Sequence, residues 1–255
     1  MSNTPDPTTP LASVPDPPAP PPRRWDWRPK ARWFAAEIVV VVAGVLIALA
    51  LNAWWSDRQR DADEAALRAE IRRDVGATRE VIAEELDGHR DLAAQARAVL
   101  TAMAEAPPGP ERDSVLARVG SVFLLGGWLP VNDTYEEALS SGRLALLTDS
   151  DLRLALSRYR SAIDDIGGMY DYIGTQYYEE LEPFMVANTV YSEVAYDQRR
   201  PDLVEAPFAT DFDALAESRE LWNLLTLRLE WEVALQEYLP RLDALAVDVL
   251  DHLDS

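Results

Sequence analysis

The chain has 255 residues, and its 44 acidic against 24 basic side chains give a formal net charge of −20. An acidic surface repels phosphate groups, which argues against a nucleic-acid-binding protein. The absence of cysteine excludes disulfides, thiolate metal sites and a cysteine nucleophile. Hydrophobic residues make up 48% of the chain, which is enough for one domain with its own core.

Residues 1–32 are predicted to be a disordered tail that ends in a basic cluster. The first 22 residues are rich in proline and carry few apolar side chains, which is typical of a partly polyproline II leader. The basic cluster consists of Arg23, Arg24, Arg28, Lys30 and Arg32. The cluster directly precedes a long apolar segment, residues 33–55. Lys and Arg next to a membrane-spanning segment bias that side of the segment to stay in the cytoplasm. We therefore expect a bacterial inner (plasma) membrane protein with a cytoplasmic N-terminus and a C-terminal domain that is periplasmic or extracellular.

Residues 33–55 are predicted to form a single transmembrane helix. The apolar run from Ile38 to Leu51 is unbroken, and the whole segment is close to the ~20 residues needed to cross a bilayer. Tryptophans at both ends suit the two membrane interfaces. The alternative is a cleaved signal peptide, because Ala48-Leu49-Ala50 has the small-x-small pattern of a cleavage site. The length of the run and the long leader favour the uncleaved anchor.

One face of this helix is a candidate for self-association in the membrane. Glu37, Gly44, Ala48 and Asn52 lie along this face, and the two small residues are four positions apart between the two polar ones. Small residues let two helix backbones approach closely, and a buried Asn or Glu can hydrogen-bond across the contact. The alternative is that Glu37 and Asn52 only mark the membrane interfaces. The predicted partners are therefore the lipid bilayer and either a protein partner or a second copy of the chain.

Residues 56–255 are predicted to form an all-α domain, an elongated bundle of three long helices with shorter ones between them. Apolar residues recur every three or four positions in three stripes, over Leu67–Met103, Leu152–Phe184 and Leu224–Leu253. The first stripe continues the transmembrane helix as one rod until the proline-rich stop at residues 106–110. Pro240 lies inside the third stripe and is expected to kink that helix.

Shorter helices are expected between the first two stripes. Ser114–Leu125 has apolar residues at helical spacing and precedes a Gly-Gly-Trp-Leu-Pro stop. Asp133, with Glu136 three residues later, is typical of a capping box that begins a helix. This helix is expected to end at Ser141-Gly142.

Two stretches of the sequence each contain a distinctive pattern of residues. The transmembrane segment has an acidic residue, small residues and an Asn-x-Trp exit at Glu37, Gly44, Ala48, Asn52 and Trp54. The middle of the chain has a Tyr-Glu-x-Leu-x-Ser-Gly-x-Leu element at Tyr135, Glu136, Leu139, Ser141, Gly142 and Leu144, with an extra Ala138 that displaces the spacing. In these stretches the chain resembles a family of bacterial membrane proteins catalogued only as a domain of unknown function. The resemblance implies an architecture and no activity.

Residues suited to chemistry are few. His89 falls on the first apolar stripe and is predicted to be a core or interface histidine. Asp248 and His252 are one helical turn apart, and with Asp251 or Asp254 they are a candidate metal site. Solvated charge near a chain terminus is the preferred interpretation. No metal, no cofactor and no catalytic residue is therefore predicted.

Tyrosines near the end of the second stripe are the other candidate site, namely Tyr170, Tyr177, Tyr178, Tyr191 and Tyr196. Tyrosine combines apolar area with a hydroxyl group, so such a cluster suits a ligand or partner surface, although core packing explains about half of it. The predicted function is a non-enzymatic, membrane-anchored helical bundle of unknown biochemical activity that acts as a protein interaction or assembly module at the membrane surface. The alternative is a periplasmic sensory domain that binds a small molecule in a tyrosine-lined pocket.

Overall fold

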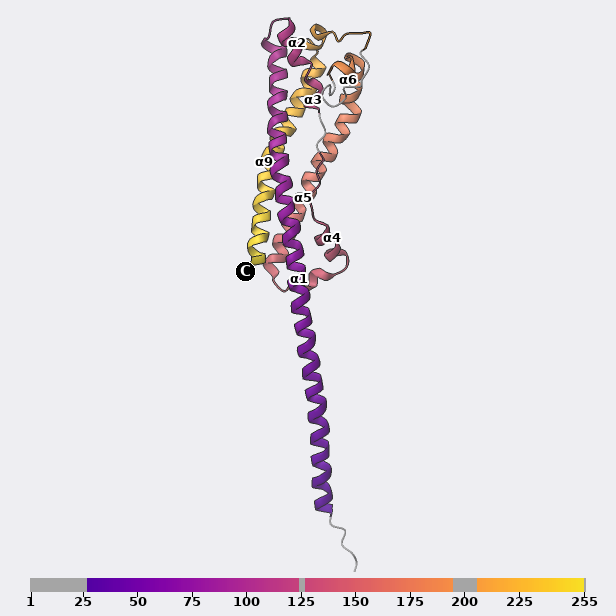
Figure 1. Cartoon of the computed structure of the whole chain (residues 1–255), viewed down its shortest axis with the longest axis vertical. Helices are drawn as coiled ribbons and strands as arrows, with labels where there is room; N and C mark the ends of the chain where they lie inside the picture. Colours follow the sequence, from indigo (N-terminus) through magenta and orange to yellow (C-terminus); the bar gives the residue numbers. More distant parts are fainter. Residues whose placement is uncertain (1–26, 124–126, 195–205, 255) are drawn as a thin grey trace, which may run out of the picture. The chain divides into compact units, whose positions relative to one another are not determined.

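The computed structural model describes residues 27–123, 127–194 and 206–254, and every regular element in these ranges is a helix (Figure 1). The predicted all-α class is therefore confirmed. The chain divides after Asp57 into two compact units, which are described separately below. The predicted tail lies outside the described residues up to position 26, whereas residues 27–32, which are also part of the predicted tail, belong to helix α1.

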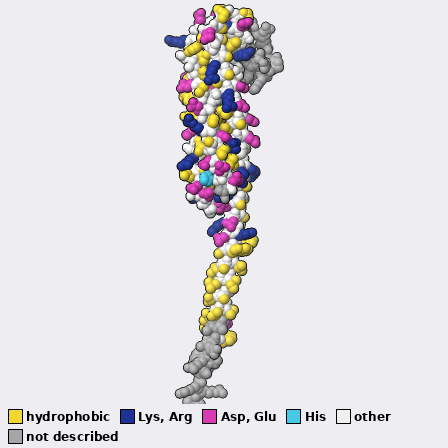
Figure 2. Space-filling model, turned by 90° about the vertical axis from the view of Figure 1, so that its left-hand side faces the viewer, with side chains coloured by type: hydrophobic (Ala, Val, Ile, Leu, Met, Phe, Trp, Pro, Cys, Tyr) yellow, Lys and Arg dark blue, Asp and Glu magenta, His cyan; other side chains and the backbone are white. Residues whose placement is uncertain are grey.

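The first unit consists of the N-terminal part of helix α1, which begins at Trp27 and ends at Glu105. From Ile38 to Leu51 every side chain is exposed, and hydrophobic groups surround this part of the helix (Figure 2). The helix is long and apolar enough to cross a membrane. Its end before Pro107 and Pro108 agrees with the predicted stop, because proline restricts the residue before it and cannot donate a backbone hydrogen bond.

The second unit is a bundle built on three long helices, which are α1 from Arg58 onward, α5 (Ser150–Gln176) and α9 (Arg219–Asp254). The shorter elements are α2 (Pro110–Leu116), α3 (Val119–Val122), α4 (Asp133–Ser140), η1 (Arg143–Leu146), η2 (Tyr177–Leu181), α6 (Glu182–Asn188), α7 (Tyr191–Val194) and α8 (Phe212–Ala216). The single helix expected over Ser114–Leu125 is thus replaced by the short helices α2 and α3. Helix α9 continues across Pro240.

Helices α1 and α9 run antiparallel. Arg79 Nε of α1 lies 2.6 Å from Asp243 Oδ1 of α9. Two turns earlier in α1, Arg72 Nη2 donates to the carbonyl oxygen of Leu253 at 2.8 Å, near the end of α9. These pairs bring the C-terminus of α9 to the same end of the bundle as α4, whereas α2, α3 and α6 lie at the other end (Figure 1).

From residue 127 to the start of α5, the chain runs along α1 in the direction opposite to that helix. The hydroxyl of Thr78 in α1 donates to the carbonyl oxygen of Val131 and accepts from its amide, both at 2.9 Å. The hydroxyl of Thr148, just before α5, donates to Glu64 Oε1 at 3.2 Å. Helix α5 therefore starts beside the first turns of the bundle part of α1 and runs in the same direction.

The core of the bundle consists of two apolar clusters. The first contains buried residues of all three long helices, including Leu67, Ile71 and Val75 of α1, Leu156, Ile163 and Ile166 of α5, and Leu235, Leu242 and Val249 of α9. The second lies at the α2 end and includes Ala96, Val99, Leu116, Val119, Phe184, Leu221 and Leu225. The three predicted stripes thus supply most of the core, because residues spaced three or four apart share one helical face.

The start of α4 differs from the predicted capping box. Asn132 is the N-cap residue, and its side chain makes no capping hydrogen bond. The amide of Thr134 in the first turn donates to Asp74 Oδ2 of α1 at 2.9 Å. The carboxylate of Glu136 instead pairs with Arg160 of α5. A tertiary ion pair has therefore replaced the local cap. The predicted end of α4 is confirmed, since Gly142 has a left-handed backbone with φ of 77°.

The second stripe continues beyond α5 through a wider turn. The segment η2 (Tyr177–Leu181) is a π-helix and is followed directly by α6, whose second residue is Pro183. Proline has no N–H for the carbonyl of Glu179, and its ring would crowd that carbonyl in a regular α-helix. The wider π turn relieves this crowding while Leu181 and Phe184 remain buried.

Truncation of a core residue tests this packing. Leu156 is fully buried in α5, whereas Leu154, two residues earlier in the same helix, is half exposed. We expect Leu156→Ala to lower the free energy of unfolding by about 2–5 kcal/mol, because the cavity it leaves adds to the lost burial. Leu154→Ala should change it by less than about 1 kcal/mol. The measurement is chemical unfolding of the full chain in detergent followed by circular dichroism, and equal effects of the two substitutions would contradict the fold.

Candidate functional site

A group of polar side chains crosses the bundle between the two apolar clusters. We define this polar layer as Glu85 and His89 of α1, Tyr170 of α5, and Arg228 and Glu232 of α9. Glu232 is fully buried, and His89 and Arg228 are only 4% and 6% exposed. Buried ionisable groups are costly unless they bond to one another, so their arrangement needs a physical explanation.

His89 is the centre of the polar layer. Its Nδ1 lies 2.6 Å from Glu232 Oε2, and its Nε2 lies 2.5 Å from the hydroxyl of Tyr170. That hydroxyl donates to Glu85 Oε2 at 2.8 Å, and the same carboxylate oxygen is 3.5 Å from His89 Nε2. On the other side, Arg228 Nε lies 2.6 Å from Glu232 Oε1. One chain of contacts thus joins all three long helices.

Helical spacing brings these residues together. Glu85 and His89 are four residues apart in α1, and Arg228 and Glu232 are four apart in α9, so each pair shares one helical face. Gln236, one turn further along α9, donates from its amide to the carbonyl oxygens of His89 at 3.2 Å and of Glu232 at 3.0 Å. This second link across the helices holds α9 against the backbone of α1 beside the imidazole.

The surroundings shift the pKa values of two members of the layer. Burial lowers the pKa of Arg228, and the neighbouring Glu232 carboxylate acts in the opposite direction. Burial raises the pKa of the Tyr170 hydroxyl strongly, and the hydrogen bond and negative charge of Glu85 raise it further. Tyr170 therefore stays protonated and acts as a hydrogen-bond donor to Glu85.

The order carboxylate, imidazole, hydroxyl in Glu232, His89 and Tyr170 is the order found in nucleophilic triads. A nucleophile, however, must lose its proton readily, whereas the pKa of Tyr170 is raised and its proton is directed to Glu85. The ring of Trp128 also stacks on Tyr170, with centroids 5.8 Å apart. These features favour a linking role for Tyr170 over nucleophilic catalysis.

The predicted tyrosine site is divided in the structure. Tyr170 belongs to the polar layer, whereas Tyr177 and Tyr178 meet edge to face in η2 with centroids 5.1 Å apart. Tyr178 and Tyr191 are exposed, and Tyr196 lies outside the described residues. A small hollow between Phe123, Tyr177, Leu181, Leu224 and Arg228 has room for about one water molecule.

The other predicted candidates are placed as follows. Glu37, Gly44, Ala48 and Asn52 are all exposed on α1 within the first unit. His252 Nε2 lies 3.8 Å from Asp248 Oδ1. Within residues 27–123, 127–194 and 206–254, no group of three or more His, Cys, Asp or Glu side chains is arranged to hold a metal ion.

The sequence prediction found His89 but missed its partners on α9. The predicted third stripe passed through Leu227, Trp231 and Tyr238, which are only partly buried or exposed. The buried face of α9 instead passes through Leu221, Leu225, Arg228, Glu232, Leu235, Leu239 and Leu242. Its spacing of three and four is as regular as the predicted one. A search for apolar residues misses this face because it contains the charged residues Arg228 and Glu232. A charged pair four residues apart within an apolar stripe is, however, itself a signal for a buried ion pair.

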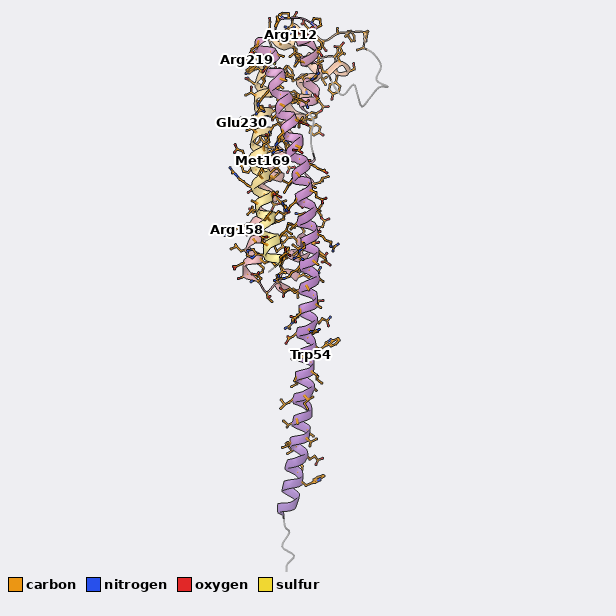
Figure 3. The ribbon with its side chains drawn as sticks, turned by 60° about the vertical axis from the view of Figure 1, so that its left-hand side comes forward. Trp54, Arg112, Arg158, Met169, Arg219 and Glu230 are labelled. Atoms are coloured by element: carbon orange, nitrogen blue, oxygen red, sulfur yellow. The ribbon has the colours of Figure 1, made fainter. Side chains whose placement is uncertain are left out.

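Removing the shared carboxylate tests the polar layer. Glu232→Gln would leave His89 and Arg228 buried without the negative charge that both contact. We expect the free energy of unfolding to fall by about 3–5 kcal/mol, as for other broken buried ion pairs. The matched control is Glu230→Gln on the outer face of α9 (Figure 3), which should cost less than about 1 kcal/mol. Wild-type stability in Glu232→Gln would show that the layer contributes little.

Comparison of the chain with protein-family models, with curated proteins and with solved structures finds no match. The resemblance to a family of bacterial membrane proteins therefore stays a prediction. The geometry of the chain is the basis for the functional proposal that follows.

Proposed function

We propose that the chain is a membrane-anchored protein whose helical domain, residues 56–255, acts as an interaction or assembly module at the membrane surface. The main observation in support of a membrane anchor is that every side chain from Ile38 to Leu51 is exposed. Transfer of one large aliphatic side chain from water to an apolar environment is worth roughly 1.5–3 kcal/mol. A run of this length therefore favours a lipid environment by a wide margin.

The flanking charges support one orientation. Five basic residues precede the apolar run within residues 23–32, whereas Arg58 and Arg60 on the other side alternate with acidic residues. Basic residues close to a span stay on the cytoplasmic side. The proposal therefore places the N-terminus in the cytoplasm of a bacterial cell and the domain on the outer side of the inner membrane.

An interaction role is favoured by the exposed apolar side chains at the α2 end of the bundle. Tyr178, Val186 and Phe208 are 64%, 66% and 73% exposed, and Trp222 is 39% exposed. Exposed large apolar side chains are a common feature of protein contact surfaces, and on this ground the proposal assigns these four to such a surface. Two hollows in the described part of the bundle have room for about one water each, so neither of these would admit a metabolite without opening. Their small size favours an interaction module over the sensory alternative.

A reporter fusion tests the anchor and its orientation. With a periplasm-active reporter fused after Ser255, we expect activity, together with full-length protein in the membrane fraction. The physical reason is the positive flank before the span, which resists translocation. Activity only with a cytoplasm-active reporter would reverse the orientation. A soluble mature chain that begins near Leu51 would show that the apolar run is a cleaved signal peptide.

Substitution of two alanines in α1 tests the predicted self-association face of the anchor. Ala48→Ile places a branched side chain on the face shared by Gly44 and Asn52, so we expect it to weaken dimers in a membrane association assay by several-fold. Ala50→Ile is the control, because two residues further along a helix corresponds to about 200° of rotation and the opposite face. If Ala48→Ile and Ala50→Ile associate equally well, the assembly surface lies elsewhere.

A further inference from the structure

The protons of the polar layer can be assigned from its hydrogen bonds. Glu232 Oε2 lies 2.6 Å from His89 Nδ1. An ionised carboxylate only accepts hydrogen bonds, so Nδ1 must carry a hydrogen. Arg228 Nε at 2.6 Å from the other oxygen of Glu232 keeps that carboxylate ionised.

The other imidazole nitrogen faces a second acceptor. The hydroxyl of Tyr170 has one hydrogen, which it donates to Glu85 Oε2 at 2.8 Å. The hydroxyl oxygen is also 2.5 Å from His89 Nε2, so at this contact it accepts and Nε2 donates. The raised pKa of Tyr170 keeps this hydroxyl protonated. Both nitrogens of His89 are therefore donors, which describes an imidazolium.

The charges of the polar layer sum to zero only when both ring nitrogens of His89 carry a hydrogen. The ionisable groups that face His89 are Glu85 on its own helix, Tyr170 on α5, and Arg228 and Glu232 on α9. An imidazolium with the Arg228 guanidinium and the two carboxylates sums to zero. With a neutral imidazole, Arg228 still compensates Glu232, and the net negative charge falls on Glu85, whose side chain is 21% exposed. A carboxylate that is mostly buried and has lost its compensating charge is unfavourable.

We propose that the folded bundle holds His89 as an imidazolium and that this proton locks α1, α5 and α9 together, so that the stability of the bundle depends on pH. When the proton leaves, Tyr170 can turn its hydrogen to Nε2, but Glu85 then loses its donor and the layer becomes negative. Loss of the proton thus costs more in the folded bundle than in the unfolded chain. A proton bound preferentially by the folded state stabilises it at lower pH, and this contribution disappears as the pH rises and His89 deprotonates.

Nuclear magnetic resonance tests the protonation state directly. His89 and His252 are the two histidines of the chain, so His252→Asn leaves a single imidazole without changing the polar layer. The probe is ¹⁵N-labelled histidine in this full-length variant in detergent micelles at neutral pH. We expect both ring nitrogens to show the shifts and couplings of an imidazolium. A neutral tautomer with a bare Nε2 would overturn the proposal.

The dependence of melting temperature on pH is the second measurement. From about pH 6, near the ordinary pKa of histidine, to about pH 9, the full-length wild type should lose a few degrees of melting temperature more than His89→Gln. His252→Asn should retain the wild-type slope, because His252 lies outside the layer. Equal slopes in the wild type and His89→Gln would overturn the proposal. If His89→Gln does not fold, the resonance measurement on His252→Asn decides by itself.

Discussion

The buried contact between His89 and Glu232 is the constraint on which the arrangement of the bundle depends. Apolar packing has no direction, and a stripe of leucines and isoleucines can slide along another by one helical turn at modest cost. A one-turn slip would instead bring the buried carboxylate of Glu232 opposite Ala93 or opposite the carboxylate of Glu85, one turn on either side of His89, and either contact is far more costly. The polar layer therefore selects one register of α1 against α9. Replacing it by apolar residues need not weaken the bundle, because its main effect is on specificity.

Helix α1 has two different patterns of side chains. From Ile38 to Leu51 it is apolar on all sides and exposed, which suits a lipid environment. From Leu67 onward only every third or fourth side chain is buried, which suits a helix that packs against other helices on one side and is exposed to water on the other. The same helix thus contains both the proposed anchor and, at Glu85 and His89, two members of the polar layer.

Periodicity was sufficient to predict the fold class, the end of α1 and the buried faces of α1 and α5, because burial repeats with the helical turn. It was only partly right on α9, where Leu235, Leu242 and Val249 are buried as predicted but Arg228 and Glu232 occupy buried positions that a hydrophobic count passes over. It also failed at α4, where Glu136 pairs with Arg160 and leaves the local cap unmade. Both errors have one physical cause. Glu232 contacts His89 and Glu136 contacts Arg160, each on another helix, and the spacing within one segment does not identify a partner on another helix.

Cross-linking of α1 to α9 is the most direct test of the register. The chain contains no cysteine, so two introduced cysteines report on one contact. Arg79→Cys with Asp243→Cys marks the observed register, since Arg79 Nε and Asp243 Oδ1 are 2.6 Å apart, and Arg79→Cys with Val247→Cys marks a slip of one turn. A short thiol-reactive cross-linker that spans the length of the replaced side chains joins the two cysteines. With the layer intact, we predict a cross-link only in the first pair. With His89, Arg228 and Glu232 all replaced by leucine, we predict cross-links in both pairs. A cross-link only in the first pair of this apolar variant would contradict a role of the polar layer in setting the register.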